Sequence, residues 1–128
     1  FSILDGSGLS RQNRLSPDQI VSVLQDMYMD LGVYPEFISV LGVMGRDGNV
    51  RKRMNGHNGA ERVRVKTGTL NSVSALSGYF QSADDERFAF SILMNDLKCS
   101  NRQARRLQDR IVGEGLNFKR VNLEVDLN

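Results

Sequence analysis

The 128-residue sequence contains few of the residues that form covalent cross-links or bind transition metals. Its single cysteine, Cys99, excludes a disulfide bond within the chain, and we expect a partly buried side chain near the start of a helix. His57 is the only histidine and lies in a loop-like stretch, where we expect it to be exposed. One cysteine and one histidine are a poor basis for a zinc site, so we predict that the chain binds no metal.

Long apolar runs are also absent. No run approaches the roughly 20 residues that a membrane-spanning helix needs, so we predict no transmembrane segment. The sequence lacks an initiator methionine and a basic-then-apolar signal segment, and it starts abruptly at Phe1. A chain of this length can bury one core. Together these features predict a single partial domain over residues 1–128 that belongs to a longer protein.

An excess of charge of one sign is missing as well. The chain has 17 basic and 15 acidic residues, and a net charge of +2 is too small to indicate a polyanionic partner. We expect the basic run at 51–53 and the arginines between 102 and 110 to be solvated or to form ion pairs within the chain. No aromatic platform accompanies these arginines, so we predict no nucleic-acid binding, and attraction to another anionic polymer is the weaker alternative.

The first helix has clear boundary signals after a loop at residues 5–14, "DGSGLSRQNR". Ser16 is a suitable N-cap, Pro17 suits the first helical position, and Gln19 completes a capping box. Gly32 is a plausible end. The apolar positions recur at helical spacing: Ile20, Val23, Leu24, Met27 and Leu31.

Two further helices are predicted. A short one covers residues 36–43 and ends near Gly45. A longer one begins after Ser100, which forms a capping box with Gln103, and ends at Gly113 or Gly115. Its expected buried stripe consists of Ala104, Leu107 and Ile111.

Three strands are predicted at residues 62–69, 72–81 and 87–95, the last two joined by the tight connection "SADDE". The run "FAFSILM" is apolar on both faces, so we expect cover on each side of that strand and pairing with a segment outside this chain. Residues 117–128 alternate weakly and favour a terminal strand. The predicted class is α+β, with helices packed on a short antiparallel sheet.

The segment "RVRVKTGTLNSVSALSGYF", residues 62–80, places Lys66, Thr67, Gly68 and Thr69 between two strand-like runs. A lysine ammonium and two hydroxyls can bind an anion, and a glycine lets a ligand approach the backbone closely. Free backbone N–H groups at a sheet edge can bind a peptide strand or stabilise an oxyanion. This chemistry favours binding of a short peptide with a carboxylate, followed by acyl transfer at its carbonyl group.

The stretch "VKTGTLNSVSALSGYF" resembles the third signature of the penicillin-recognising serine acyl-transferases. The similarity is greatest to the D-alanyl-D-alanine carboxypeptidases/endopeptidases among the class C, low-molecular-mass penicillin-binding proteins, peptidase family S13. "DGSGLSRQN" near the start, followed by "SP" and a helix, resembles a second feature of that family. The resemblance covers about residues 2–116. It implies the C-terminal portion of a β-lactamase/transpeptidase-like domain.

The family's K-T-G motif carries over to four positions. The resemblance implies that Lys66 orients the substrate carboxylate and tunes the nucleophile, and that Thr67 and Thr69 hydrogen-bond this carboxylate. Gly68 would leave room for substrate, and the backbone N–H of Thr69 would form half of the oxyanion hole. Asp5 and Arg11 are assigned only structural support, in a loop where Arg11 is expected to form an ion pair.

The family's other two motifs are absent from this sequence. No serine is followed by lysine three places on, and none by asparagine two places on. The resemblance therefore implies a chain that supplies the K-T-G wall of the active site, needs the N-terminal remainder of the same protein, and is inactive alone.

The implied enzyme is a serine-type D-Ala-D-Ala carboxypeptidase, with endopeptidase action as a further activity left open. Its substrate would be a peptidoglycan peptide ending in D-Ala-D-Ala, and β-lactams would acylate it. No cofactor is implied, and the implied location is periplasmic or otherwise extracytoplasmic. A non-catalytic module from the same family, binding a peptide or a partner, is the alternative.

Overall fold

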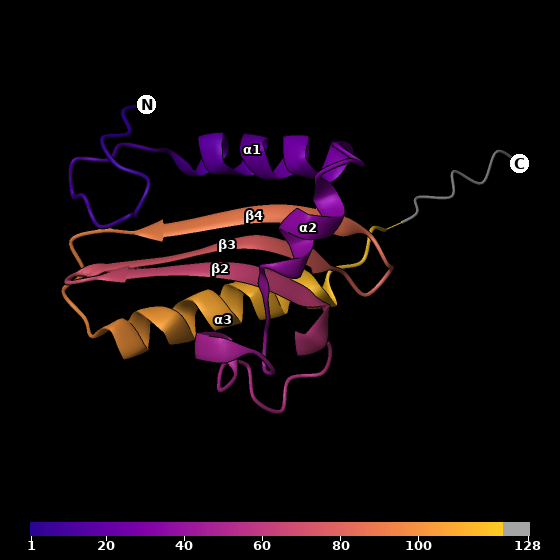
Figure 1. Cartoon of the computed structure of the whole chain (residues 1–128). Coiled ribbons are helices and arrows are strands. Elements are labelled where there is room, and N and C mark those ends of the chain that lie inside the picture. The colour runs from indigo at the N-terminus through magenta and orange to yellow at the C-terminus, as the bar shows by residue number, and fades with distance from the viewer. Residues whose placement is uncertain (122–128) are drawn as a thin grey trace, which may run out of the picture.

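The structure is a computed structural model, and it describes residues 1–121 of the chain (Figure 1). Two short 3₁₀ helices, η1 and η2, accompany the regular elements. The order along the chain is α1 (Pro17–Met29), α2 (Tyr34–Ser39), β1 (Gly42–Val43), η1 (Gly48–Val50), η2 (Ala60–Arg62), β2 (Val63–Leu70), β3 (Val73–Gln81), β4 (Arg87–Met94) and α3 (Asn101–Asn117).

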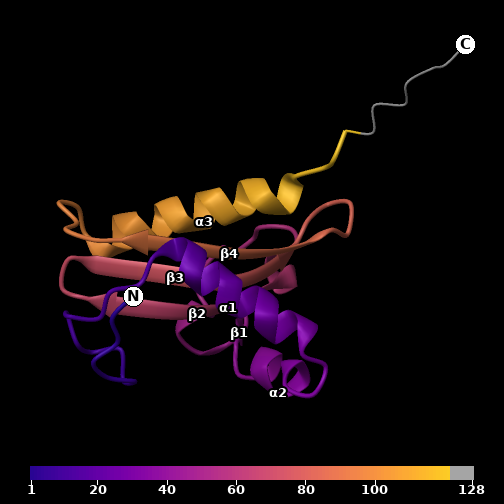
Figure 2. The ribbon, with the colours of Figure 1, turned by 90° about the horizontal axis from the view of Figure 1, so that it is seen from above.

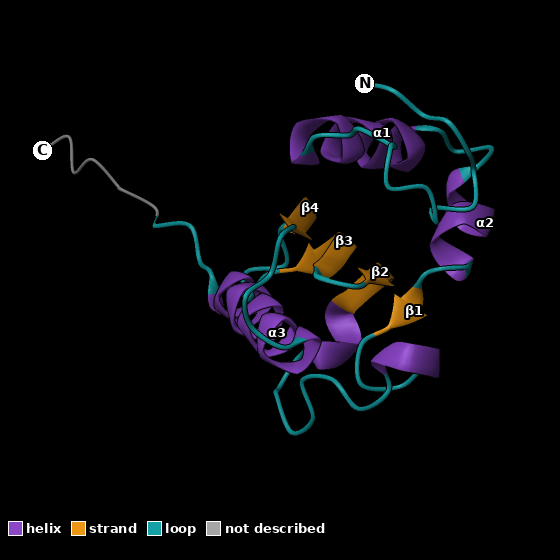
Figure 3. Cartoon of the chain, turned by 90° about the vertical axis from the view of Figure 1, so that its left-hand side faces the viewer, coloured by secondary structure: helices purple, strands orange, loops and turns teal. Residues whose placement is uncertain are grey.

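The strands form one antiparallel sheet in the order β1-β2-β3-β4. α1 and α2 cover one face of the sheet and α3 covers the other (Figure 3). Seen from above, α1 lies obliquely over the strands (Figure 2). This arrangement confirms the predicted α+β class. Within residues 1–121, no helix combines the length and the apolarity that crossing a membrane requires.

The first helix begins as predicted, with the Ser16 side chain accepting from the Gln19 backbone N–H in a capping box. It ends at Met29, before the expected Gly32, and Leu31 is 87% exposed. Residues 42 and 43, predicted to be helical, instead form β1, so the second helix was placed too late in the sequence. The backbone groups of these two residues pair with β2. A strand of two residues is too short to show a periodic pattern in the sequence.

The predicted bounds of the three long strands are correct to within one residue, and the short connection between β3 and β4 is confirmed. β4 has cover on both faces: Phe90 and Ile92 pack into the core beneath α3, and Ala89 packs with residues of α1 and α2. In the described part of the chain β4 is an edge strand. Its pairing with a segment outside the chain stays a prediction.

The buried face of α3 differs from the predicted one. Its N-terminal capping box is as expected, but Leu107 and Ile111 are about half exposed. The residues that face the sheet instead follow a spacing of four: Ala104, Gln108, Val112 and Leu116. The helix also continues past Gly113 and Gly115.

The glycine at 115 serves close packing rather than helix termination. A β-carbon there would lie 2.6 Å from the ring of Phe80 in β3. Such a distance requires the ring or the helix to move. Gly115 therefore lets α3 approach the sheet closely.

Two apolar clusters fill the two interfaces of the sheet. The smaller cluster, under α1 and α2, is centred on Leu24, Leu41 and Tyr79. The larger one lies under α3 and consists of Met44, Val50, Ala60, Val63, Val65, Leu76, Val112 and Leu116. Both clusters use side chains from β2 or β3, so the central strands are held from two sides.

Two single residues depart from expectation. Cys99 is exposed, because it precedes the N-cap of α3 and lies ahead of that helix's first buried residue. His57 is half-buried: its Nδ1 lies 2.8 Å from the carbonyl oxygen of Asn58, and Gly113 of α3 lies close to its ring. Neither residue belongs to a metal cluster among the described residues.

The predicted C-terminal strand at 117–128 is not seen over residues 117–121, the part of it that the structure describes. Asn117 belongs to α3, and residues 118–121 have no regular secondary structure. Residues 122–128 lie outside the described part of the chain.

Candidate functional site at the open edge of β2

The outer edge of β2 is paired along only part of its length. β1 pairs with Arg64 and Val65, and no other strand of the described sheet reaches the segment from Lys66 to Leu70. This segment contains the K-T-G motif, and it pairs with β3 on its inner side only. The motif therefore lies on a free sheet edge within residues 1–121.

The backbone of β2 determines which groups face this open edge. The carbonyl of Val63 points outward, since it accepts from the Met44 N–H at 3.0 Å. Main-chain groups of alternate residues in an antiparallel strand point to the same side, and the register with β3 is unbroken to Leu70. Thr67 and Thr69 therefore direct their backbone N–H and C=O groups to the open edge. These groups have the orientation that the predicted oxyanion-hole role of Thr69 requires.

Lys66 is exposed, and its Nζ donates to the Thr67 carbonyl oxygen at 2.9 Å. It lines a groove of about 530 Å³ together with Thr67 and Gly68. The opposite wall is apolar and comes from α1, α2 and the two residues that follow α2; it includes Val23 and Val40, both more than half exposed. The ammonium thus lies at the rim of a groove, neither buried in the core nor isolated on a flat surface.

Gly68 lies on the same face of β2 as Lys66, opposite Ala75 of β3. A β-carbon at Gly68 would lie 3.4 Å from that of Ala75, which is an ordinary contact distance. The fold itself therefore tolerates alanine at this position. The glycine keeps the groove open beside the strand edge.

The hydroxyls of Thr67 and Thr69 lie on the opposite face, toward α3, because side chains alternate along a strand. Asn49 Nδ2, from η1, donates to Thr67 Oγ1 at 2.7 Å. Arg105 Nη2, from α3, donates to Thr69 Oγ1 at a longer 3.4 Å. Sequence reasoning grouped the lysine with both hydroxyls and missed Asn49 entirely, since a loop asparagine carries no pattern that points to β2.

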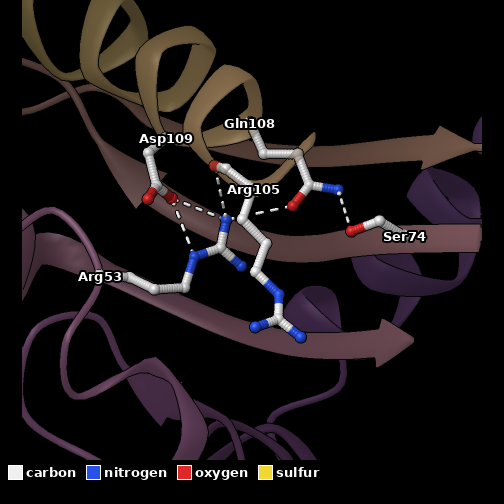
Figure 4. Close-up of polar contacts among 5 residues, drawn as sticks. All are labelled: Arg53, Ser74, Arg105, Gln108 and Asp109. Carbon is white, nitrogen blue, oxygen red and sulfur yellow. Dashed lines mark hydrogen bonds and ion pairs between the residues drawn. The ribbon is translucent and has the colours of Figure 1, made fainter. Parts of the chain in front are cut away.

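A buried polar network fixes α3 beside these threonines (Figure 4). Arg53 donates to Asp109 Oδ1 through Nε at 2.9 Å and Nη2 at 2.6 Å, and Nη2 also reaches Gln108 Oε1 at 3.1 Å. The Gln108 amide in turn donates to Ser74 Oγ of β3 at 3.1 Å. Every buried side-chain polar atom described has a partner. The network therefore holds the first turns of α3, and with them Arg105, against the sheet.

The Arg105 side chain extends from the helix past this network, while its backbone carbonyl accepts from Arg53 Nη2 at 3.2 Å (Figure 4). Arg105 was expected to be solvated or to form an ion pair within the chain. It is exposed in the structure, and it also reaches Thr69 near the end of β2, a contact that only the tertiary fold brings about.

The loop at residues 5–14 is closed by its own side chains. Asp5 accepts from Asn13 Nδ2 at 3.0 Å and from Ser7 Oγ at 2.9 Å, and these bonds lower the pKa of Asp5, the bond from Asn13 most. Arg11 Nη2 donates to the carbonyl of Asn71 in the β2–β3 turn at 3.0 Å. The expected ion pair of Arg11 is wrong, because no ion pair among the described residues includes it. The loop thus contacts the turn that ends β2.

A family model and several known proteins match this chain. The model describes the D-Ala-D-Ala carboxypeptidase 3 (S13) family and matches residues 1–115. The penicillin-sensitive carboxypeptidase A of Dictyostelium discoideum is 30% identical over 118 residues, which cover 88% of this chain and 23% of that protein. The D-alanyl-D-alanine carboxypeptidase of Actinomadura sp. (strain R39) is 38% identical over 100 residues, covering 71% and 18% respectively.

Among solved structures, penicillin binding protein 4 of Haemophilus influenzae superposes with a TM-score of 0.78 at 27% identity. The match covers 91% of this chain and 28% of that protein. A second structure of the same protein, in complex with a β-lactam, gives a TM-score of 0.76. The chain spans less than a third of the length of each of these relatives.

Proposed function

Because the chain belongs to the D-Ala-D-Ala carboxypeptidase 3 (S13) family, we propose that it forms one wall of the active site of a serine-type D-Ala-D-Ala carboxypeptidase. The proposed substrates are peptidoglycan stem peptides, and penicillins acylate the same site. One observation carries the proposal: the K-T-G motif occupies a free edge of β2, with Lys66 at the rim of a groove and the N–H of Thr69 directed outward.

Each residue of the motif has a proposed role. Lys66 supplies the positive charge that orients the substrate carboxylate and favours the deprotonated nucleophile. The hydroxyls of Thr67 and Thr69 donate to that carboxylate. The backbone N–H of Thr69 donates to the oxyanion that forms when the carbonyl carbon is attacked, an interaction worth about 3–4 kcal/mol in known enzymes. Gly68 leaves the edge accessible.

The nucleophile belongs, in this proposal, to the N-terminal remainder of the same protein, with its S-x-x-K and S-x-N motifs. The serine attacks the penultimate D-alanine carbonyl, and its proton ends on the departing D-alanine amine as the C–N bond breaks. Water then hydrolyses the seryl ester. Because no S-x-x-K motif occurs here, the 128-residue chain alone is inactive. The exposed apolar wall of the Lys66 groove supports the proposal that such an N-terminal remainder packs beside it.

A location outside the cytoplasmic membrane follows from the proposed substrate, because peptidoglycan is assembled there. The relatives named as penicillin-sensitive or D-alanyl-D-alanine carboxypeptidases support this proposal.

The proposal is tested by adding a fluorescent penicillin to the full-length protein and to its Lys66→Ala and Lys98→Ala variants. We expect covalent labelling of the wild type and of Lys98→Ala, which alters an exposed lysine outside the groove. Labelling of Lys66→Ala should slow by about 100-fold or more, the scale seen when one electrostatic contact to the reacting group is lost. Labelling of Lys66→Ala at the wild-type rate would refute the role of Lys66.

A non-catalytic peptide-binding module is the second candidate, and the free edge of β2 also supports it, since such edges bind peptides by adding a strand. The upstream sequence of the natural protein separates the two. S-x-x-K and S-x-N motifs there favour the enzyme, whereas a start codon at Phe1 favours the module.

A further inference from the structure

The loop at residues 54–59 contains two asparagine–glycine pairs, Asn55-Gly56 and Asn58-Gly59. Both asparagines are exposed, and both glycines adopt the left-handed backbone that favours glycine, with φ of 80° and 90°. The backbone nitrogen that follows an asparagine can attack the carbon of its side-chain amide. A glycine hinders this attack least, because it has no side chain. Each pair therefore has the chemistry for deamidation, a reaction that needs no enzyme.

The loop projects from a fixed base, and its reactive nitrogens are not engaged. Arg53 before the loop and Ala60 after it are buried, and both lie close to Gly45. Within residues 1–121, neither Gly56 nor Gly59 donates a backbone hydrogen bond. The two nitrogens are therefore available for reaction without the loss of a hydrogen bond that stabilises the described fold.

His57 makes the two pairs chemically different. Its Nδ1 lies 2.8 Å from the carbonyl oxygen of Asn58, and because a carbonyl oxygen can only accept, Nδ1 carries the proton in this contact. That oxygen belongs to the same peptide group as the nitrogen of Gly59. A hydrogen bond to the oxygen stabilises the anion that forms when this nitrogen loses its proton, so it favours the attacking form. Among the described residues, no backbone donor reaches the carbonyl of Asn55.

Helix α3 holds the His57 ring in place. The ring is half-buried, and a β-carbon at Gly113 of α3 would lie 3.1 Å from its Nε2. The absence of a side chain at Gly113 therefore makes room for the imidazole. The contact between His57 and Asn58 thus depends on the folded chain as well as on their adjacency in sequence.

The two aspartate–glycine pairs of the chain have different surroundings. Asp5 accepts the two side-chain hydrogen bonds described above, and Asp47 accepts from the Val43 N–H at 2.9 Å. An ionised carboxylate is a weaker electrophile than an amide, and these bonds also restrict its movement. The same cyclisation should therefore be slow at both aspartates, which makes them controls.

We propose that Asn58 is a site of spontaneous deamidation that His57 promotes. The nitrogen of Gly59 bonds to the side-chain carbon of Asn58 and loses its proton to water, and the amide nitrogen departs as ammonia. One water molecule then opens the cyclic imide to give aspartate or isoaspartate. The product places a negative charge next to Gly59, against which the guanidinium of Arg62 lies. Isoaspartate also lengthens the main chain immediately before η2.

The test incubates the full-length protein at neutral pH, both folded and in concentrated urea. The wild type is compared with His57→Phe, which keeps a ring and removes the donor, and with His57→Ala. Trypsin cleaves after Arg53 and Arg62, so residues 54–62 form one peptide in which tandem mass spectrometry follows both asparagines. Asn55 is thus an internal control. Thermal unfolding shows which variants are folded.

In the folded wild type we expect Asn58 to convert about fivefold faster than Asn55, the scale of one hydrogen bond. In urea and in the His57 variants the two rates should become similar, because the donor is lost. Asp5 and Asp47 should gain no isoaspartate. Equal rates at the two asparagines of the folded wild type would overturn the proposal, and so would a preference for Asn58 that persists in urea or in a folded His57 variant. If neither variant folds, the comparison of folded and urea-treated wild type decides.

Discussion

The two halves of β2 have the same strand geometry but different surroundings. Within residues 63–65, Arg64 and Val65 pair with strands on both sides, the Val63 carbonyl accepts from the Met44 N–H, and Val63 and Val65 are almost completely buried under α3. In the part of the chain that the structure describes, residues 66–70 pair with β3 alone, and Lys66 and Thr69 are exposed. The closed half therefore fixes the strand in the core. The open half presents backbone donors and polar side chains that the core does not need.

This difference indicates how a rigid site is built at a sheet edge. The register of β2 with β3 continues without interruption across both halves, so the position of Thr69 is set by pairing that is anchored at Val63. Donors on such a strand are preorganised, which is the condition for strong electrostatic stabilisation of a transition state. Substitutions in the closed half should therefore affect stability, and those in the open half should affect acylation.

The largest effect is expected for Gly78→Ala, which tests the closed half. Gly78 lies opposite Val65, and a β-carbon there would overlap the Arg64 carbonyl oxygen and lie 2.9 Å from Val65 Cα. Backbone atoms cannot yield as a flexible side chain does. We expect a loss of about 3 kcal/mol or more in the free energy of unfolding, measured by urea denaturation of the full-length protein. A wild-type midpoint would show that the two strands are less closely packed than described.

The next effect is a dependence of stability on pH, and it also tests the closed half of β2. Tyr79 lies opposite Arg64, and its buried hydroxyl donates to the Leu24 carbonyl. Burial raises the pKa of Tyr79 from 10.0 to about 12. The stabilising contribution is complete below pH 10, and it is lost as pH rises toward 12, because the unfolded chain releases the proton first. Stability should fall by about 1.4 kcal/mol per pH unit in that interval.

Tyr79→Phe separates this contribution from those of the other tyrosines. The variant should be less stable than the wild type at neutral pH and should lose less stability between pH 10 and 12, as followed by thermal unfolding. Parallel pH profiles for the two proteins would contradict the assignment to Tyr79.

A smaller effect is expected for Gly68→Ala, the counterpart of Gly78→Ala in the open half. The added methyl meets only Ala75 at an ordinary distance, so the unfolding midpoint should change little. It narrows the groove beside Lys66, however, and we expect penicillin acylation to slow about tenfold, or about 1.4 kcal/mol. A large loss of stability without a change in the acylation rate would reverse the roles assigned to the two halves.

The smallest effect is expected for Thr67→Val, which keeps the side-chain shape and removes one hydroxyl. Loss of one hydrogen bond to the carboxylate costs about 1 kcal/mol, or about fivefold in the second-order rate of acylation. Thr67→Ser is the matched control and should retain the rate. Equal rates for the valine and serine variants would show that this hydroxyl does not contact the β-lactam.

Local patterns were sufficient to predict most of the elements. The capping boxes at Ser16 and Ser100, the strand-like runs on either side of the K-T-G motif and the apolar run in β4 placed two helices and three strands, because these signals depend only on neighbouring residues. Strand β1 was missed, since two residues are too few for a periodic pattern.

The buried face of α3 shows where hydrophobicity misleads. Gln108 is fully buried because Arg53 and Ser74 satisfy its amide, whereas Leu107 is about half exposed. A polar residue with distant partners looks like a surface residue in the sequence. The sequence therefore favoured Leu107 and Ile111, which are about half exposed, and of the predicted buried stripe only Ala104 is buried.

The motif at residues 66–69 could be located from the sequence, but its surroundings could not. The contacts of Asn49 with Thr67 and of Arg105 with Thr69 join residues 18 and 36 positions apart. The convergence of residues 51–53 with the start of α3 on one groove is equally non-local. Only the packed fold reveals them.

The most direct test of the central claim is a crystal structure of the full-length protein acylated by a β-lactam. We predict that the acyl carbonyl oxygen lies about 3 Å from the backbone nitrogen of Thr69, and that the carboxylate lies within hydrogen-bond distance of the Thr67 or Thr69 hydroxyl. An acyl group directed away from the open half of β2, or another strand paired with Thr67 and Thr69, would contradict the account.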